Sequence, residues 1–188
     1  MRRPTPAVTL LFLAPFVGEV LLGSTLLSRL PLFLVQVGMY GGGALLIREL
    51  VRRRNLVSHW LLLLGFAYGV FEEGIVLQSL FNPHFPGLDI LGTYGRAAGV
   101  NWVWAEFILG YHAVFSISIP VVLTELMFPE ESRTTWLSRR ALILVAAGFL
   151  ANCLLLAVFL TGAFSRRHTP TPPALLLAAA AVAGTVVA

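Results

Sequence analysis

The chain has 188 residues, of which 57% are apolar and 12% are charged, and its mean hydropathy is +0.84. A typical soluble domain carries about 25% charged residues, so this composition excludes an ordinary soluble globule and a disordered chain. All 13 basic residues are arginines, and they lie in short clusters between long apolar runs. This pattern is typical of a polytopic membrane protein and does not favour a nucleic-acid partner. A single cysteine, Cys153, excludes an intrachain disulfide.

Six apolar segments are candidate membrane spans. A helix needs about 20 mostly apolar residues to cross about 30 Å of hydrocarbon, and five segments have that length. The last segment is shorter, so it is either a short final span or part of a longer natural chain. The apolar runs do not alternate as barrel strands would, which predicts an all-α, polytopic transmembrane helix bundle. We expect one transmembrane domain, 1–188, with spans at about 7–30, 31–50, 59–81, 101–128, 141–164 and 173–188.

Two further expectations concern the arrangement of these spans. The run Gly41–Gly43 in the second span predicts a close approach between helices. The positive-inside rule predicts a cytoplasmic N-terminus, because nine arginines then face the cytoplasm and four face outside. The nine are Arg2, Arg3, Arg48, Arg52, Arg53, Arg54, Arg133, Arg139 and Arg140, and the four are Arg29, Arg96, Arg166 and Arg167. We therefore expect a multi-pass protein of a cell membrane, in particular a bacterial inner membrane, with the lipid bilayer as its partner and its oligomeric state left open.

Four acidic residues, Glu19, Glu72, Glu73 and Glu106, lie inside the predicted spans. Ionisable groups within a span are costly and indicate a functional site by default. At about 1.5 Å per residue, these acids and His112 lie about 14–22 Å from the cytoplasmic side, in one layer. We expect Glu72, Glu73, Glu106 and His112 to form a polar cluster, with Glu19 as a further candidate member.

The acids near the span ends need no special role. Arg48 and Glu49 are expected to form a local ion pair with a structural function. Glu125, Glu130 and Glu131 lie near predicted cytoplasmic ends, where water or arginines can reach them.

The expected cluster suits several kinds of chemistry. Two adjacent carboxylates in apolar surroundings cannot both ionise cheaply, so at least one is expected to be protonated at pH 7. A carboxylate beside an imidazole can activate a water, can bind zinc or iron, or can relay protons; a neutral network that only fixes packing is the alternative. Neighbouring helical residues point about 100° apart, so we expect only one of Glu72 and Glu73 to face the site. Glu72 shares a helical face with Tyr68 and Ser79.

Residues 82–100 form an outer loop that is longer than a simple turn needs. We expect it to fold over the outer side of the bundle as a lid or an interfacial segment. His84 and Asp89 in this loop are weaker candidates for a metal site with His112. Trp102 and Trp104 are expected to anchor the chain at the membrane interface.

A Glu-Glu pair followed by a His in a later apolar helix resembles the CAAX-protease and bacteriocin-processing (CPBP) family of intramembrane proteases. The resemblance assigns Glu72 and Glu73 to the first motif of that family and His112 to the second. The Arg of the first motif is replaced by Leu77, Phe107 lies one residue too far from His112, and no His precedes Asn152 for the third motif. The stretches 40–49 and 99–104 also look like an uncharacterised bacterial multispan membrane protein family.

These features favour an integral membrane protein with a buried Glu/His cluster that acts as a protease-like intramembrane hydrolase. Glu72 or Glu73 would activate a water and His112 would bind or polarise it. The expected substrate is a membrane-embedded peptide or a lipid-linked molecule, and the cofactor is either a divalent metal or none. The alternatives are a proton- or cation-coupled transporter subunit and a non-catalytic membrane scaffold. No Gly-rich phosphate loop, Ser-His-Asp order or HExxH motif is present.

Overall fold

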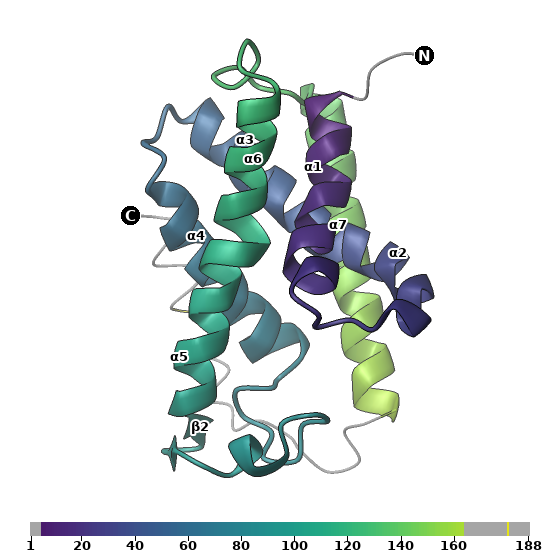
Figure 1. The fold of residues 1–188 in the computed structure, drawn as a ribbon, viewed down its shortest axis with the longest axis vertical. Coiled ribbons are helices and arrows are strands. Elements are labelled where there is room, and N and C mark those ends of the chain that lie inside the picture. Colours follow the sequence, from purple (N-terminus) through teal and green to yellow (C-terminus); the bar gives the residue numbers. More distant parts are fainter. Residues whose placement is uncertain (1–4, 164–179, 181–188) are drawn as a thin grey trace.

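The computed structural model describes residues 5–163 and residue 180, and it is mostly helical (Figure 1). Several helical stretches follow one another without a break, and some of the stretches are π-helical (η1, η3, η4 and η6) or 3₁₀-helical (η2 and η5). In chain order they are α1 (Pro6–Pro15), η1 (Phe16–Leu21), η2 (Leu27–Leu32), α2 (Phe33–Gln36), η3 (Val37–Gly41), α3 (Gly42–Arg53), α4 (Trp60–Gly69), η4 (Val70–Val76), η5 (Asp89–Gly92), α5 (Trp102–Tyr111), η6 (His112–Ser118), α6 (Ile119–Met127) and α7 (Arg139–Ala163). A two-residue antiparallel pair, β1 (Arg96–Ala97) and β2 (Val100–Asn101), lies in the outer loop.

Five longer helices occupy the first five predicted positions, but they are not five long spans. Only Phe33–Arg53, Trp102–Met127 and Arg139–Val158 are long and apolar enough to cross a membrane within the described residues. The first helix, Pro6–Leu21, is shorter than the predicted span because the chain turns at Gly23, whose φ is +78°. The third predicted span stops being helical after Val76, since Gln78 takes a φ of +61°. The predicted sixth span, 173–188, lies outside the described part of the chain apart from residue 180.

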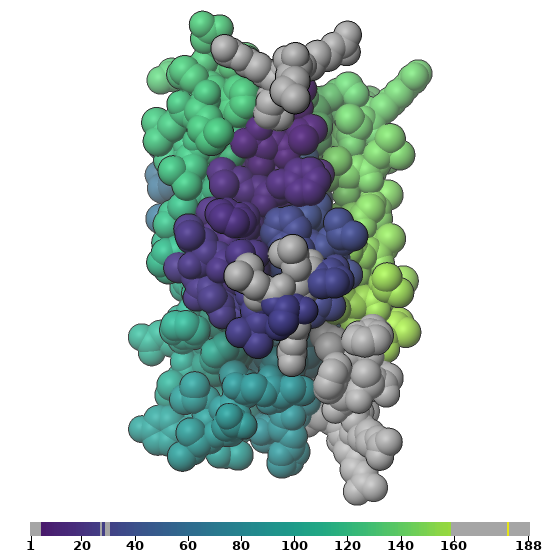
Figure 2. All heavy atoms as spheres, turned by 45° about the vertical axis from the view of Figure 1, so that its right-hand side comes forward, coloured from purple at the N-terminus to yellow at the C-terminus, as the bar shows by residue number. Residues whose placement is uncertain are grey.

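The helices form one bundle. Figure 1 shows α5, η6 and α6 running along the long axis, with α1 and α7 beside them and α3 crossing obliquely. On the face drawn in Figure 2, α1 and the segment that follows it lie between α6 and α7. The main buried cluster joins α1, α3, α4 and α6 through residues such as Leu10, Leu45, Leu61 and Val121.

Glycines set the closest helix contacts in this bundle. A Cβ atom at Gly65 of α4 would lie 2.8 Å from the Cα of Ala113, and one at Gly69 would lie 3.1 Å from the Cβ of His112. The predicted close approach at Gly41–Gly43 is confirmed, because Gly41 faces the backbone of Leu11 and Gly43 faces the ring of Tyr68. Without side chains at these positions, helix backbones pack at distances that any larger residue would prevent.

Arg48 near the end of α3 holds the loop between α6 and α7. Its guanidinium is fully buried and donates to Glu49 (3.2 Å) and Glu125 (3.1 Å). The same group donates to three backbone carbonyls of the loop, those of Glu131, Ser132 and Thr134, and lies 3.5 Å from the ring centroid of Trp136. The predicted Arg48–Glu49 pair is therefore confirmed, and it is part of a larger network in which two carboxylates and three carbonyl oxygens accept hydrogen bonds from the guanidinium.

Replacement of Arg48 should unfold the protein far more readily than replacement of a nearby exposed arginine. The Arg48→Met variant leaves the carboxylate of Glu49 buried with one partner fewer, a change that typically costs about 3–5 kcal/mol. Arg54→Met is the control, since Arg54 is exposed at the end of the same helix and such changes stay within about 0.5 kcal/mol. The temperature at which buried Cys153, the only cysteine of the sequence, becomes reactive to a thiol dye measures both. Equal midpoints for the two variants would contradict the assigned role.

A methyl group should be tolerated at one glycine of the bundle and not at another. Gly65→Ala forces α4 away from the backbone of Ala113, and overpacking of this kind costs about 1–3 kcal/mol. Gly110→Ala on α5 meets no atom within 4 Å, so it should be neutral or raise the stability by up to about 1 kcal/mol, as Gly→Ala changes in helices do. The same Cys153 assay compares the two variants, and a stable Gly65→Ala protein would show that this contact does not limit the packing.

Candidate functional site

Glu72, Glu73 and His112 meet in the interior of the bundle. Both glutamates lie on η4 and His112 begins η6. Their side chains are 1%, 4% and 1% exposed, and one carboxylate oxygen or ring nitrogen from each lies within 4.8 Å of the others. The three residues that the sequence singles out for chemistry therefore form one cluster.

The two carboxylates contact the two nitrogens of a single imidazole. Oε1 of Glu73 lies 3.1 Å from Nε2 of His112, and Oε2 of Glu72 lies 3.5 Å from Nδ1. The expectation that only one of the glutamates faces the site is therefore wrong. The angle between neighbouring residues separates their Cβ atoms, but two long side chains can reach opposite edges of one ring.

A chain of hydrogen bonds fixes Glu73. Ser79 donates to Oε2 of Glu73, and Nε1 of Trp104 donates to Oγ of Ser79 over 2.9 Å. The sequence places Ser79 on the face of Glu72, but the helix ends at Val76 and the chain folds back, so Ser79 contacts Glu73 instead. Trp104, expected as an interfacial anchor, thus also supports the site.

Glu72 differs from Glu73 in having no hydrogen-bond partner. Both of its buried carboxylate oxygens lack one, and so does the hydroxyl of Tyr68, one turn earlier on α4. The hydroxyls of Tyr68 and Tyr40 nevertheless lie within hydrogen-bonding reach of the Glu72 carboxylate, although neither contact has good hydrogen-bond geometry. Nδ1 of His112, which Glu72 faces, also lies 3.0 Å from Oγ of Ser116. The carboxylate of Glu72, the hydroxyl of Tyr68 and the imidazole of His112 therefore form one buried polar group in which hydrogen-bonding capacity remains.

Two tyrosines enclose the imidazole. Tyr40 on η3 stacks on His112 with ring centroids 5.9 Å apart, and Tyr68 meets it edge-on at 5.7 Å. The sequence analysis did not identify Tyr40 as a site residue. Its position directly before the glycine run, which brings η3 and α3 close to their neighbours, could have indicated that it lies in the interior.

Glu19 lies beside the cluster rather than in it. Its Oε2 accepts hydrogen bonds from Thr25 (2.6 Å) and Gln36 (3.1 Å), and its carboxylate interacts with the hydroxyl of Tyr40. Tyr40 interacts with Glu72 as well, so it connects the two acids.

The remaining sequence candidates are not brought to the cluster. Glu106 is exposed on α5, pointing away from the interior. His84 and Asp89 are exposed in the outer loop, and the group of metal-type ligands found among the described residues contains neither of them.

The cluster is chemically suited to bind a cation or to activate a water. Two carboxylates and one imidazole offer oxygen and nitrogen ligands that zinc and iron accept. With a neutral imidazole the two ionised carboxylates would carry two negative charges in apolar surroundings, which requires protons or a cation.

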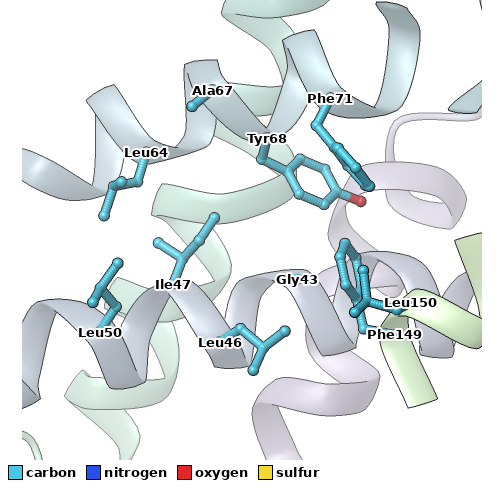
Figure 3. A pocket seen from close by; sticks show the side chains of 10 residues that line it. All are labelled: Gly43, Leu46, Ile47, Leu50, Leu64, Ala67, Tyr68, Phe71, Phe149 and Leu150. Atoms are coloured by element: carbon cyan, nitrogen blue, oxygen red, sulfur yellow. The ribbon is translucent and has the colours of Figure 1, made fainter. Parts of the chain in front are cut away.

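An apolar pocket of about 260 Å³ adjoins the cluster. Figure 3 shows it between α3 and α4, with Phe149 and Leu150 of α7 at one end. Tyr68 lines this pocket and also contacts His112, so its ring separates the pocket from the buried polar groups.

Neither a curated protein nor a solved structure matches the chain. The sequence model of one family does match, over residues 8–188, and that family is described as an uncharacterized membrane protein family. This match gives no support to the resemblance to the CPBP proteases, while it agrees with the resemblance to an uncharacterised multispan family. The apolar helices agree with a lipid bilayer as the surroundings, and the buried Glu/His cluster lies among them. The protein belongs to this uncharacterized membrane protein family.

Proposed function

We propose that the protein is an intramembrane hydrolase in which Glu72 and His112 activate a water. The observation that carries the proposal is the Glu72 carboxylate, which is buried beside an imidazole and two tyrosine hydroxyls and makes no hydrogen bond of good geometry. A scaffold that used its acids only for packing would pair them, as Glu19 is paired with Thr25 and Gln36. Glu72 instead has free lone pairs where a water can donate its protons.

The neighbouring residues have separate roles in this reaction. Glu73, held by Ser79, accepts the N–H of His112 at Nε2, which leaves Nδ1 directed at Glu72. Glu72 takes a proton from the water while the water oxygen bonds to the substrate carbonyl carbon. The hydroxyl of Tyr68 donates to the carbonyl oxygen, on which negative charge develops. When the carbon–oxygen or carbon–nitrogen bond breaks, the leaving group takes the proton from Glu72.

We also propose the finer topology, with six spans, a cytoplasmic N-terminus and a location in a bacterial inner membrane. The start of α1, the end of α3 and the α6–α7 loop lie at the same end of the bundle (Figure 1). Arg48, Arg52, Arg53 and Arg133 are at this end, and Arg96 is at the other, which is the asymmetry that the positive-inside rule associates with the cytoplasm.

A second candidate function is the handling of a cation in transport. It is favoured by one observation, the approach of three ligand atoms from Glu72, Glu73 and His112 to within 4.8 Å of one another. A divalent ion there would balance the charge of both carboxylates.

Loss of both carboxylates should abolish hydrolysis. The Glu72→Gln, Glu73→Gln double variant should lose about 10²–10⁴-fold in rate, the usual contribution of a general base, on fluorogenic acyl esters and apolar peptides presented in lipid nanodiscs. Glu106→Gln, which changes an exposed acid of a neighbouring helix, should leave the rate unchanged. A double variant that folds normally, as Cys153 protection shows, and keeps the wild-type activity would rule the hydrolase out.

The cation candidate predicts ligand-field absorption when Co²⁺ is added to the purified protein. His112→Ala should remove this signal because the imidazole is one of three ligands. The control is His84→Ala, since His84 is exposed in the outer loop and is not part of the ligand group. Indistinguishable Co²⁺ spectra for wild type and His112→Ala would refute a cation site at this cluster.

A further inference from the structure

The apolar pocket beside Tyr68 has one polar feature. Its lining comes from α3, α4, the start of η4 and α7, and the Tyr68 hydroxyl is the one polar side-chain atom that the lining residues carry. Figure 3 shows the Tyr68 ring extending from α4 with its hydroxyl toward Phe149. The pocket is therefore a space for hydrocarbon that is bounded at one end by the Tyr68 ring, with the buried Tyr68 hydroxyl directly behind it.

We propose that this pocket binds the acyl chain of a lipid substrate whose carbonyl group accepts a hydrogen bond from Tyr68. This inference rests on the proposed hydrolase function, and it selects a lipid acyl derivative over a membrane-embedded peptide as the substrate class.

The lack of any polar side-chain atom in the lining other than the Tyr68 hydroxyl argues against a peptide in the pocket. An extended peptide carries an N–H and a C=O group on each residue, and in an apolar environment each unpaired group is costly. The lining backbone is helical and its polar groups are already paired within α3, α4 and α7. An acyl chain brings no such groups along its length, and its single carbonyl matches the single donor.

The position of Tyr68 explains why the carbonyl end would lie at the cluster. The Tyr68 hydroxyl is buried without a partner, and Glu72, also without one, follows it by one helical turn. The ring of Tyr68 packs against Phe149 on the pocket side (6.3 Å) and against His112 on the other (5.7 Å). A carbonyl bound at Tyr68 is thus adjacent to the carboxylate that would activate the water.

The chain offers a matched control groove. A second apolar pocket, of about 420 Å³, lies on α1, the start of η1 and α2 and includes Phe12, Phe16 and Phe33. It faces outward, as the half-exposed Phe12 and Phe16 show, and it contains neither Tyr68 nor a member of the cluster. Lipid that merely surrounds the protein should contact this groove as readily as the pocket beside Tyr68.

The test is photolabelling of the full chain in lipid nanodiscs with a lauric acid analogue that carries a diazirine on its alkyl chain. We expect mass spectrometry to find the label on α3, α4 and α7 lining residues in preference to the control groove, with competition by methyl laurate.

Leu46→Trp or Leu150→Trp, which fill the pocket from two different helices, should each weaken labelling about tenfold, as expected when roughly two methylene groups lose their burial. Leu34→Trp, at a strongly exposed site on α2, should not. Using two pocket variants guards against misfolding of one of them.

Three outcomes would overturn the acyl-chain site: equal labelling of the two grooves, labelling that both pocket-filling variants leave unchanged, or displacement of the probe by an apolar peptide but not by methyl laurate. The Glu72→Gln, Glu73→Gln variant separates this inference from the proposed function, because it should keep the label. If labelling is specific while wild type hydrolyses no acyl ester, the acyl-chain site stands and the hydrolase fails. If wild type hydrolyses peptides and labelling is unspecific, the hydrolase stands and the acyl-chain site fails.

Discussion

The structure depends on the close approach of α4 to η6 that Gly65 and Gly69 permit. Any side chain at these positions would meet the backbone of Ala113 or the side chain of His112. This approach brings η4, with its two glutamates, to the imidazole. It also explains why helix packing and the polar cluster are inseparable here: in lipid there is little hydrophobic gain from pairing apolar helices, so small residues and polar contacts determine which helices meet.

Six polar residues of this region lie on π-helical segments. Glu19 is on η1, Tyr40 on η3, Glu72 and Glu73 on η4, and His112 and Ser116 on η6. A π-turn adds a residue to the helical turn and shifts the direction of the side chains that follow, and such turns are frequent at functional sites. The irregular backbone at this level is consistent with a site that positions side chains rather than with helices that only pack.

Two buried ionic clusters in the bundle differ in how completely their charged groups are hydrogen-bonded. The cluster around Arg48 is saturated, since its guanidinium has two carboxylates, three carbonyls and an indole as neighbours. This cluster holds the loop between α6 and α7, and its guanidinium keeps no free hydrogen-bond donor for a ligand. The cluster around His112 contains two acids for one imidazole and leaves the Glu72 carboxylate without a hydrogen bond. The contrast between a saturated and an unsaturated cluster separates a structural role from a site that has capacity to bind.

The sequence by itself determined the membrane class, the positions of five helices and the three residues of the cluster, because scarce charges inside apolar runs are informative wherever they occur. Only the tertiary structure decided that Glu106 points outward, that His84 and Asp89 stay in the loop, and that both Glu72 and Glu73 reach His112. These outcomes depend on the rotation of each helix and on where η4 ends at Val76. Helical periodicity along the sequence cannot specify them, since π-turns alter the period and the glycine contacts that fix the rotation join residues distant in the chain.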